Sequence, residues 1–178
     1  MSNIYNSLYN LSNRLHGDEL GGQWYPVPAV LRAVLSRMSK TSQIVGYTKM
    51  FAGYDLTAYA PNALGCAEAV SRVICQVFPD FGIYTGTAQL DAIFRIDTRF
   101  RKLAAGEEIQ PGDIIVSPTG SGNGKIAHGH TGIFVENKRI YNNDSQTGKW
   151  MQTWTDLSWR AYFVGKGGFT VNIYRVTV

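Results

Sequence analysis

Cys66, His130 and Asn142 are the three residues of this chain whose types and order most clearly suggest chemistry. A cysteine becomes a nucleophile as a thiolate, which a helix N-terminus and a nearby imidazolium stabilise. Cys66 follows Gly65 at the start of an apolar helical pattern. Backbone N–H groups there lack helical partners and can bind an oxyanion, and we expect the glycine to let a substrate carbonyl approach closely. The pattern predicts a hydrolase with Cys66 as nucleophile.

His130 is the predicted base, because it begins an apolar run that is typical of a strand. The next strand would bring Asn142 beside it, with Asp144 just beyond, and either side chain could orient the imidazole. We expect Cys66 Sγ to lie within about 4 Å of one ring nitrogen of His130. His128 could face the same way, but it lies closer to an irregular loop and is predicted not to be the base.

The second cysteine, Cys75, is expected to be a structural residue inside the same helix. Nine residues separate it from Cys66, which places the two thiols on roughly opposite helix faces. The sequence therefore predicts no disulfide between them and no cysteine-based zinc site.

Residues 1–60 are predicted to form a helical and irregular part that packs on a catalytic core of residues 61–178. An apolar stripe indicates a helix at 27–38, and a polar, Tyr-rich stretch at 39–62 indicates a long connection. An earlier helix is suggested by Leu8, Leu11 and Leu15, next to His16, a histidine without a companion motif.

The core is predicted to begin with helices and continue with antiparallel strands, the order of an α+β fold in one domain of 1–178. Gly120–Gly124 reads as a flexible loop, and Asn137–Lys138 as a hairpin turn. Two helices are expected in the core: one begins at Gly65–Cys66 and ends at Pro79, and the other covers 87–95. The expected strands lie at 114–116, 130–136, 139–142, 150–154 and 169–177.

Four segments together resemble the CHAP and NlpC-type cell-wall cysteine peptidases, most closely members encoded by bacteriophages: Gly65–Val70, Pro111–Ile115, Gly129–Phe134 and Asn142. The resemblance implies a papain-like α+β fold with N-terminal helices before a central antiparallel sheet. It also implies hydrolysis of peptidoglycan amide bonds without a cofactor or metal. By position, it assigns Cys66 as nucleophile, His130 as base and Asn142 as the third polar residue. It does not define which bond is cut.

Two other enzyme classes fit the sequence less well. A metal hydrolase could use His128 and His130 with Asp113 or Asp144 as ligands. A nucleotide site at Gly120–Lys125 fails, because its spacing is one residue short and no Ser or Thr follows to hold magnesium.

A module that binds the cell wall, or a structural virion protein, is the non-enzymatic alternative. Tryptophans near the C-terminus could form a sugar-binding platform: Trp150, Trp154 and Trp159. We expect them instead to pack in the core or against strands.

The composition and charge of the chain limit which partners and which place of action we expect. The 178 residues are 44% hydrophobic and 17% charged, with a net charge of +4 and a pI near 9.1. This charge favours anionic wall polymers, whereas the densest basic cluster (Arg99, Arg101 and Lys102) is too small to predict nucleic-acid binding. With no signal peptide and no membrane span in the sequence, we expect synthesis in the cytoplasm and action on the bacterial cell wall.

Overall fold

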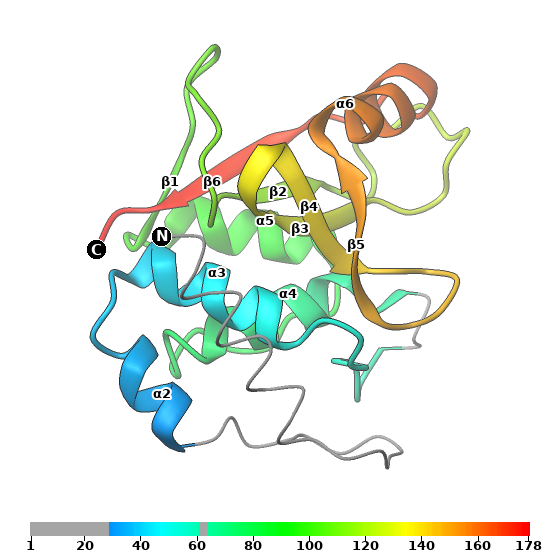
Figure 1. Cartoon of the computed structure of the whole chain (residues 1–178). Helices are drawn as coiled ribbons and strands as arrows, with labels where there is room; N and C mark the ends of the chain where they lie inside the picture. Colours follow the sequence, from blue (N-terminus) through cyan, green and yellow to red (C-terminus); the bar gives the residue numbers. More distant parts are fainter. Residues whose placement is uncertain (1–28, 61–63) are drawn as a thin grey trace.

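The chain forms an α+β fold built on a six-stranded antiparallel sheet with strand order β1-β6-β2-β3-β4-β5 (Figure 1). The computed structural model describes residues 29–60 and 64–178, so the helix predicted around Leu8–Leu15 and His16 lie outside the described residues. Within these ranges, no helix is long and apolar enough to cross a membrane.

Helices precede most of the strands, as the sequence predicts. The helices are α2 (Ala29–Leu35), α3 (Lys40–Met50), α4 (Cys66–Cys75), α5 (Thr87–Ile96) and α6 (Asp156–Trp159), which continues into the π-helix η3 (Arg160–Lys166). The strands are β1 (Phe100–Lys102), β2 (Ile114–Ser117), β3 (His130–Phe134), β4 (Arg139–Asn143), β5 (Trp150–Thr155) and β6 (Asn172–Val176), with the 3-10 turn η2 (Glu136–Lys138) between β3 and β4.

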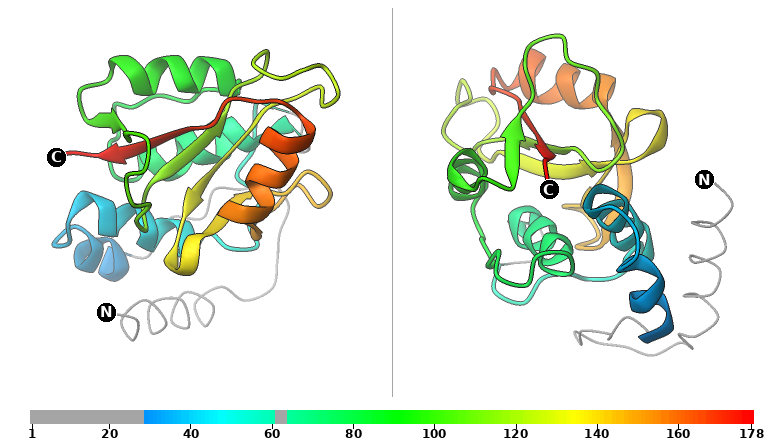
Figure 2. Two further views of the ribbon diagram at one scale, coloured as in Figure 1. Left: turned by 90° about the horizontal axis from the view of Figure 1, so that it is seen from above. Right: turned by 90° about the vertical axis from the view of Figure 1, so that its left-hand side faces the viewer.

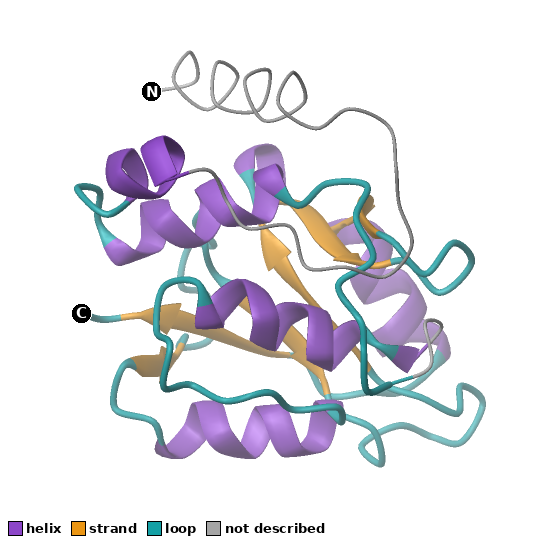
Figure 3. Cartoon of the chain, turned by 90° about the horizontal axis from the view of Figure 1, so that it is seen from below, coloured by secondary structure: helices purple, strands orange, loops and turns teal. Residues whose placement is uncertain are grey.

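The two faces of the sheet are covered by different helices. α3, α4 and α5 lie on one face, and α6 with η3 lies on the other (Figures 1 and 2). We call α3, α4 and α5 the first layer; seen from below in Figure 3, its helices lie in front of the strands. In β2, Ile114 and Val116 join the core under α4, whereas Ile115 joins the core under α6 and η3. A strand buried on both faces accounts for the unbroken apolar run at this position.

α4 is the central helix of the first layer. Its residues Ala67, Val70, Val73 and Ile74 have no solvent-exposed surface. Fully burying a Val or Ile side chain contributes about 1.5–3 kcal/mol, so this face fixes the helix firmly on the sheet. The helix ends at Cys75, four residues before the predicted end at Pro79, because the following backbone turns at Gln76 and Val77.

The hairpin of β3 and β4 confirms the predicted pair of strands and the turn between them, although β3 ends at Phe134 and Glu136 belongs to the turn. Asn137 and Lys138 both have positive φ angles, of 58° and 53°, which the tight reversal requires. Phe134 pairs with Ile140 across the hairpin. The hairpin therefore sets the relative positions of the residues at its open end.

The connection predicted over residues 39–62 is wrong in its first half, which forms α3. Ser39 caps this helix by accepting a hydrogen bond from the Ser42 backbone. Gln43, Tyr47 and Thr48 are buried along with the apolar residues, so no amphipathic stripe marks the helix in the sequence.

Two further differences concern the helices at either end. In α2, Leu31 and Leu35 are buried, but Val30 and Val34 of the predicted apolar stripe are exposed. The segment of α6 and η3 was not predicted as helical, although Thr155 and Ser158 form a capping box at its start.

Candidate active site

His130 and Asn142 form a hydrogen-bonded pair on adjacent strands. His130 Nε2 lies 2.8 Å from Asn142 Oδ1. The Asn142 amide nitrogen donates to the Met151 carbonyl at 3.2 Å and to Thr153 Oγ1 at 2.6 Å. A carbonyl oxygen can only accept, so the amide oxygen must face His130 and accept from its Nε2–H. In the neutral imidazole, Nδ1 is then unprotonated and able to act as a base.

Aromatic rings cover the imidazole of His130. It stacks on Trp159 and on Phe163, with ring centroids 5.3 and 5.6 Å apart. Burial lowers the pKa of His130 below its usual 6.5. The hydrogen bond with Asn142 and the negative charge of Asp144 offset that effect only in part. The neutral base is therefore favoured near neutral pH.

Cys66 is the first residue of α4 and is buried, with 6% of its surface exposed. Burial raises the pKa of its thiol to about 11, although the backbone N–H groups of Thr131, Ala67 and Cys66 itself act in the opposite direction. The resting residue is accordingly a protonated thiol near neutral pH. The same N–H groups are suited to hold negative charge that develops beside the sulfur.

Cys66 lies near the start of β3, the strand that begins with His130. α4 packs on the face of the sheet opposite α6 and η3, and the thiol lies against the backbone of Thr131, the residue after His130 (Figure 1). No hydrogen bond joins Sγ of Cys66 to the ring of His130, and both residues lie within the described part of the chain. The direct thiol–imidazole contact therefore stays a prediction.

Gly65 has a packing role that the sequence did not indicate. A Cβ atom at this position would lie 2.0 Å from Cγ2 of Thr57. Thr57 is itself held by Asp55, whose carboxylate accepts from its backbone N–H and its hydroxyl. The absence of a side chain at Gly65 thus lets the segment before α4 pack tightly against the helix start. This geometry accounts for the glycine without the predicted approach of a substrate carbonyl.

Glu68 anchors the segment before Cys66, and sequence reasoning missed it. Its fully buried carboxylate accepts hydrogen bonds from Arg72 and from the backbone N–H groups of residues 58–60. Burial raises the pKa of Glu68, but the hydrogen bonds outweigh it and leave the pKa below its usual 4.5. The Arg72 guanidinium also lies over the ring of Tyr59, 5.3 Å from its centroid. The signal in the sequence was a Glu–Arg pair at helical i,i+4 spacing.

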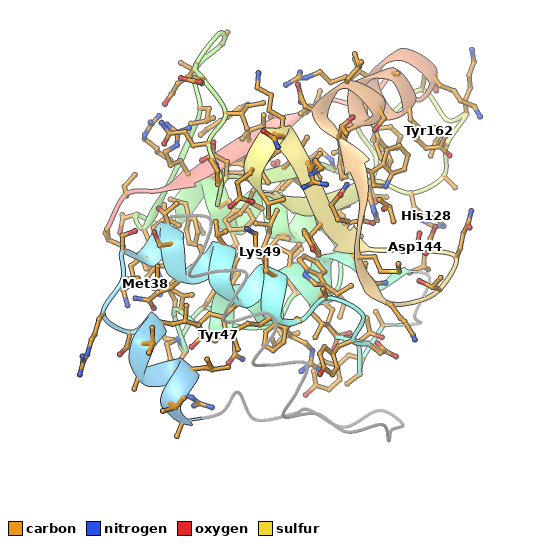
Figure 4. All side chains as sticks on the ribbon, in the orientation of Figure 1. Met38, Tyr47, Lys49, His128, Asp144 and Tyr162 are labelled. Carbon is orange, nitrogen blue, oxygen red and sulfur yellow. The ribbon has the colours of Figure 1, made fainter. Side chains whose placement is uncertain are left out.

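The remaining predicted polar residues take separate roles. Asp144 accepts from the backbone and hydroxyl of Thr147, so Asn142 and not Asp144 is the hydrogen-bond partner of His130. His128 is exposed on the loop before β3, and Figure 4 shows it at the surface.

Cys75 differs from its predicted position inside the helix. It is the last residue of α4 and is partly exposed, and its thiol donates to the Gly82 carbonyl at 3.4 Å. The helix ends earlier than predicted, which brings Cys75 to the surface.

The loop before β3, predicted to be flexible, is tied down at several points. Asn123 donates its backbone N–H to the Gly167 carbonyl at 2.8 Å and its amide to the Lys166 carbonyl at 3.2 Å. At the ends of the loop, Thr119 and Gly129 are joined by a 2.9 Å hydrogen bond. These hydrogen bonds tie the loop to the end of η3 and join its two ends just before β3.

The three tryptophans pack in or against the core, as expected. Trp150 and Trp159 are fully buried, and their indole N–H groups donate to the Thr48 carbonyl and to Ser117 Oγ. Trp154 is partly buried and packs against Trp159. Two of the three rings are therefore not exposed for a sugar to stack on.

A metal site gains no support from the described residues. Within 29–60 and 64–178, no three His, Cys, Asp or Glu side chains come together as ligands. Asp113 is buried and paired with Arg175 at 2.7 Å. It precedes β2, while His130 pairs with Ser117 at the other end of that strand.

Comparison with models of protein families gave no match, and comparison with curated proteins also gave none. The function must therefore be inferred from the residues of the site itself.

Proposed function

We propose that this chain is a cysteine amidohydrolase or endopeptidase with a papain-like fold that hydrolyses amide bonds in bacterial peptidoglycan. The observation that carries the proposal is the pairing of His130 Nε2 with Asn142 Oδ1. It leaves Nδ1 as the basic nitrogen of His130, the first residue of β3, and Cys66 is the first residue of α4. A thiol at a helix start with a base oriented by a third polar group is the arrangement that acyl transfer requires.

The first half of the reaction forms an acyl-enzyme. His130 accepts the thiol proton at Nδ1 while Cys66 Sγ attacks the carbonyl carbon of the amide. The carbonyl oxygen takes the negative charge and is held by backbone N–H groups at the start of α4. The C–N bond then breaks as the imidazolium of His130 protonates the leaving amine, and a thioester remains on Cys66.

The second half releases the product. His130 deprotonates a water molecule, which attacks the thioester carbonyl and regenerates the thiol together with a carboxylic acid. Asn142 accepts from Nε2–H throughout, so the ring keeps its orientation while Nδ1 gains and loses the proton. Because burial favours the thiol and the neutral imidazole at rest, proton transfer accompanies the attack of sulfur instead of preceding it.

Peptidoglycan is the proposed substrate because the sequence segments that include Cys66, His130 and Asn142 resemble those of CHAP and NlpC-type peptidases. The net charge of +4 suits the anionic polymers of a bacterial wall. The proposed place of action is the cell wall, reached as a virion-associated enzyme or on lysis.

Digestion of purified peptidoglycan tests the proposal. Wild type and Cys75→Ser should release soluble fragments at rates within about twofold of each other, because Cys75 lies at the far end of α4. Cys66→Ser and Cys66→Ala should release them at least about 1,000 times more slowly, as expected when a nucleophile is removed. Mass spectrometry of the fragments would identify the bond from its new termini.

Equal release by wild type and both Cys66 variants would contradict the mechanism. A wild type that sediments with the walls but releases no fragment would instead support the wall-binding alternative, which the buried thiol of Cys66 also fits.

A further inference from the structure

β5 contains a bulge beside the candidate site. Across from it on β4, Tyr141 pairs with Gln152 and the preceding Ile140 pairs with Trp154. Thr153 is thus the additional residue, with no Cα partner on β4. Bulges locally disturb the alternation of a strand and redirect a side chain, and they are over-represented next to active sites.

The redirected side chain contacts the one residue that holds the base. Thr153 Oγ1 accepts from the Asn142 amide nitrogen at 2.6 Å, while the Met151 carbonyl accepts from the same nitrogen at the longer distance of 3.2 Å. Asn142 is buried, with 1% of its surface exposed, whereas Thr153 lies at the surface of the edge strand.

The direction of the Asn142 amide decides which nitrogen of His130 carries the proton. With its oxygen toward the ring, the amide accepts from Nε2–H and leaves Nδ1 basic. If the amide rotated by 180°, its nitrogen would donate to Nε2, and the proton would move to Nδ1. A ring protonated at Nδ1 cannot take the proton of Cys66 through that atom.

We propose that Thr153 is a positioning residue: beside the Met151 carbonyl it supplies a second acceptor for the Asn142 amide nitrogen, which helps hold the amide oxygen toward His130 and keep Nδ1 as the basic nitrogen. This role rests on the proposed function of Cys66 and His130, but it concerns a residue that touches neither substrate nor thiol. The bulge of β5 supplies the hydroxyl at the position where the amide nitrogen needs an acceptor.

Two substitutions separate the hydroxyl from the shape of the side chain. Thr153→Val keeps the β-branched shape and removes the acceptor, and Thr153→Ser keeps the acceptor. Imidazole ¹⁵N NMR would report the tautomer of His130, and kcat and KM would be measured on peptidoglycan fragments. Thr153→Val should populate the Nδ1–H tautomer and lower kcat by about 3- to 10-fold, the effect of one ordinary hydrogen bond. KM should change little, and Thr153→Ser should restore both the tautomer and kcat.

A Thr153→Val variant with the wild-type tautomer and a kcat within about twofold of wild type would overturn the role of Thr153. So would a Thr153→Ser variant that behaves like Thr153→Val. A wild type that cleaves nothing would count against the proposed function alone, because the NMR comparison still tests whether Thr153 sets the tautomer.

Discussion

The His130 imidazole lies between an apolar cover and a single hydrogen-bonding side chain. Trp159 and Phe163 shield one side of the ring, and Asn142 binds Nε2. The shielding makes the neutral form more stable, while the hydrogen bond limits how far the pKa falls. In the proposed mechanism, this balance sets the lowest pH at which the base can work.

The pH dependence of catalysis should report that balance. The acidic limb of kcat/KM for wild type should have its midpoint below 6.5, because His130 stays neutral to lower pH than an exposed histidine. Asn142→Asp should move the midpoint to higher pH, since a carboxylate stabilises the imidazolium. Asn142→Ala removes a contact that raises the pKa of His130, so it should move the midpoint to lower pH and also slow the reaction. Identical midpoints in all three proteins would show that another group controls the acidic limb.

The choice between Asn142 and Asp144 illustrates what the sequence could and could not define. The order of strands and turn predicted that a polar residue of β4 would reach His130, and the structure places Asn142 there. The cover by Trp159 and Phe163 could not be predicted, because η3 comes from a segment without a recognised helical pattern. The contact of Thr153 depends on a bulge, which no sequence signal marked.

Among the elements, α4 and the segment before it form one unit through Glu68. The carboxylate holds residues 58–60 and Arg72 together beside the start of the helix that carries Cys66. α4 was predictable because its apolar residues repeat at helical spacing. α3 was not, since its buried residues surround the helix and include polar ones.

Replacing Glu68 by glutamine should destabilise this unit. Arg72 would lose its buried charged partner, and breaking such a pair costs about 3–5 kcal/mol of unfolding free energy. Urea denaturation at pH 7 would measure the loss. The exposed Glu108 provides the control, and Glu108→Gln should change the stability by less than about 0.5 kcal/mol.

The effect should also depend on pH. The folded pKa of Glu68 lies below its usual 4.5, so its ionised form stabilises the fold at pH values above 4.5, and this contribution is lost as the pH falls through the folded pKa. The difference between wild type and Glu68→Gln should therefore be largest near neutral pH and narrow in acid. A difference below about 1 kcal/mol at pH 7 would show that the anchor contributes little.

At the scale of the whole molecule, the two candidate catalytic residues belong to different layers. Cys66 comes from the helices on one face of the sheet, and the ring of His130 packs under η3 on the other face (Figure 2). The sequence predicted the strands β2 to β6 and the helices α2, α4 and α5, but which helix covers which face follows from long-range packing. The proposed pairing would therefore have to form at the start of β3, where Thr131 lies against Cys66.

Activation of Cys66 by His130 is the central claim, and the rate of thiol alkylation tests it most directly. The second-order rate constant for iodoacetamide at Cys66 would be measured at pH 7 in a Cys75→Ser background, so that one thiol reports. His130→Ala should lower this rate constant by about 10-fold or more, because the thiol loses the base that accepts its proton. His128→Ala should leave it within about twofold of the parent, since that side chain is exposed on the neighbouring loop (Figure 4). An unchanged rate in His130→Ala, or a fall that follows His128→Ala instead, would contradict the assignment of His130 as the base.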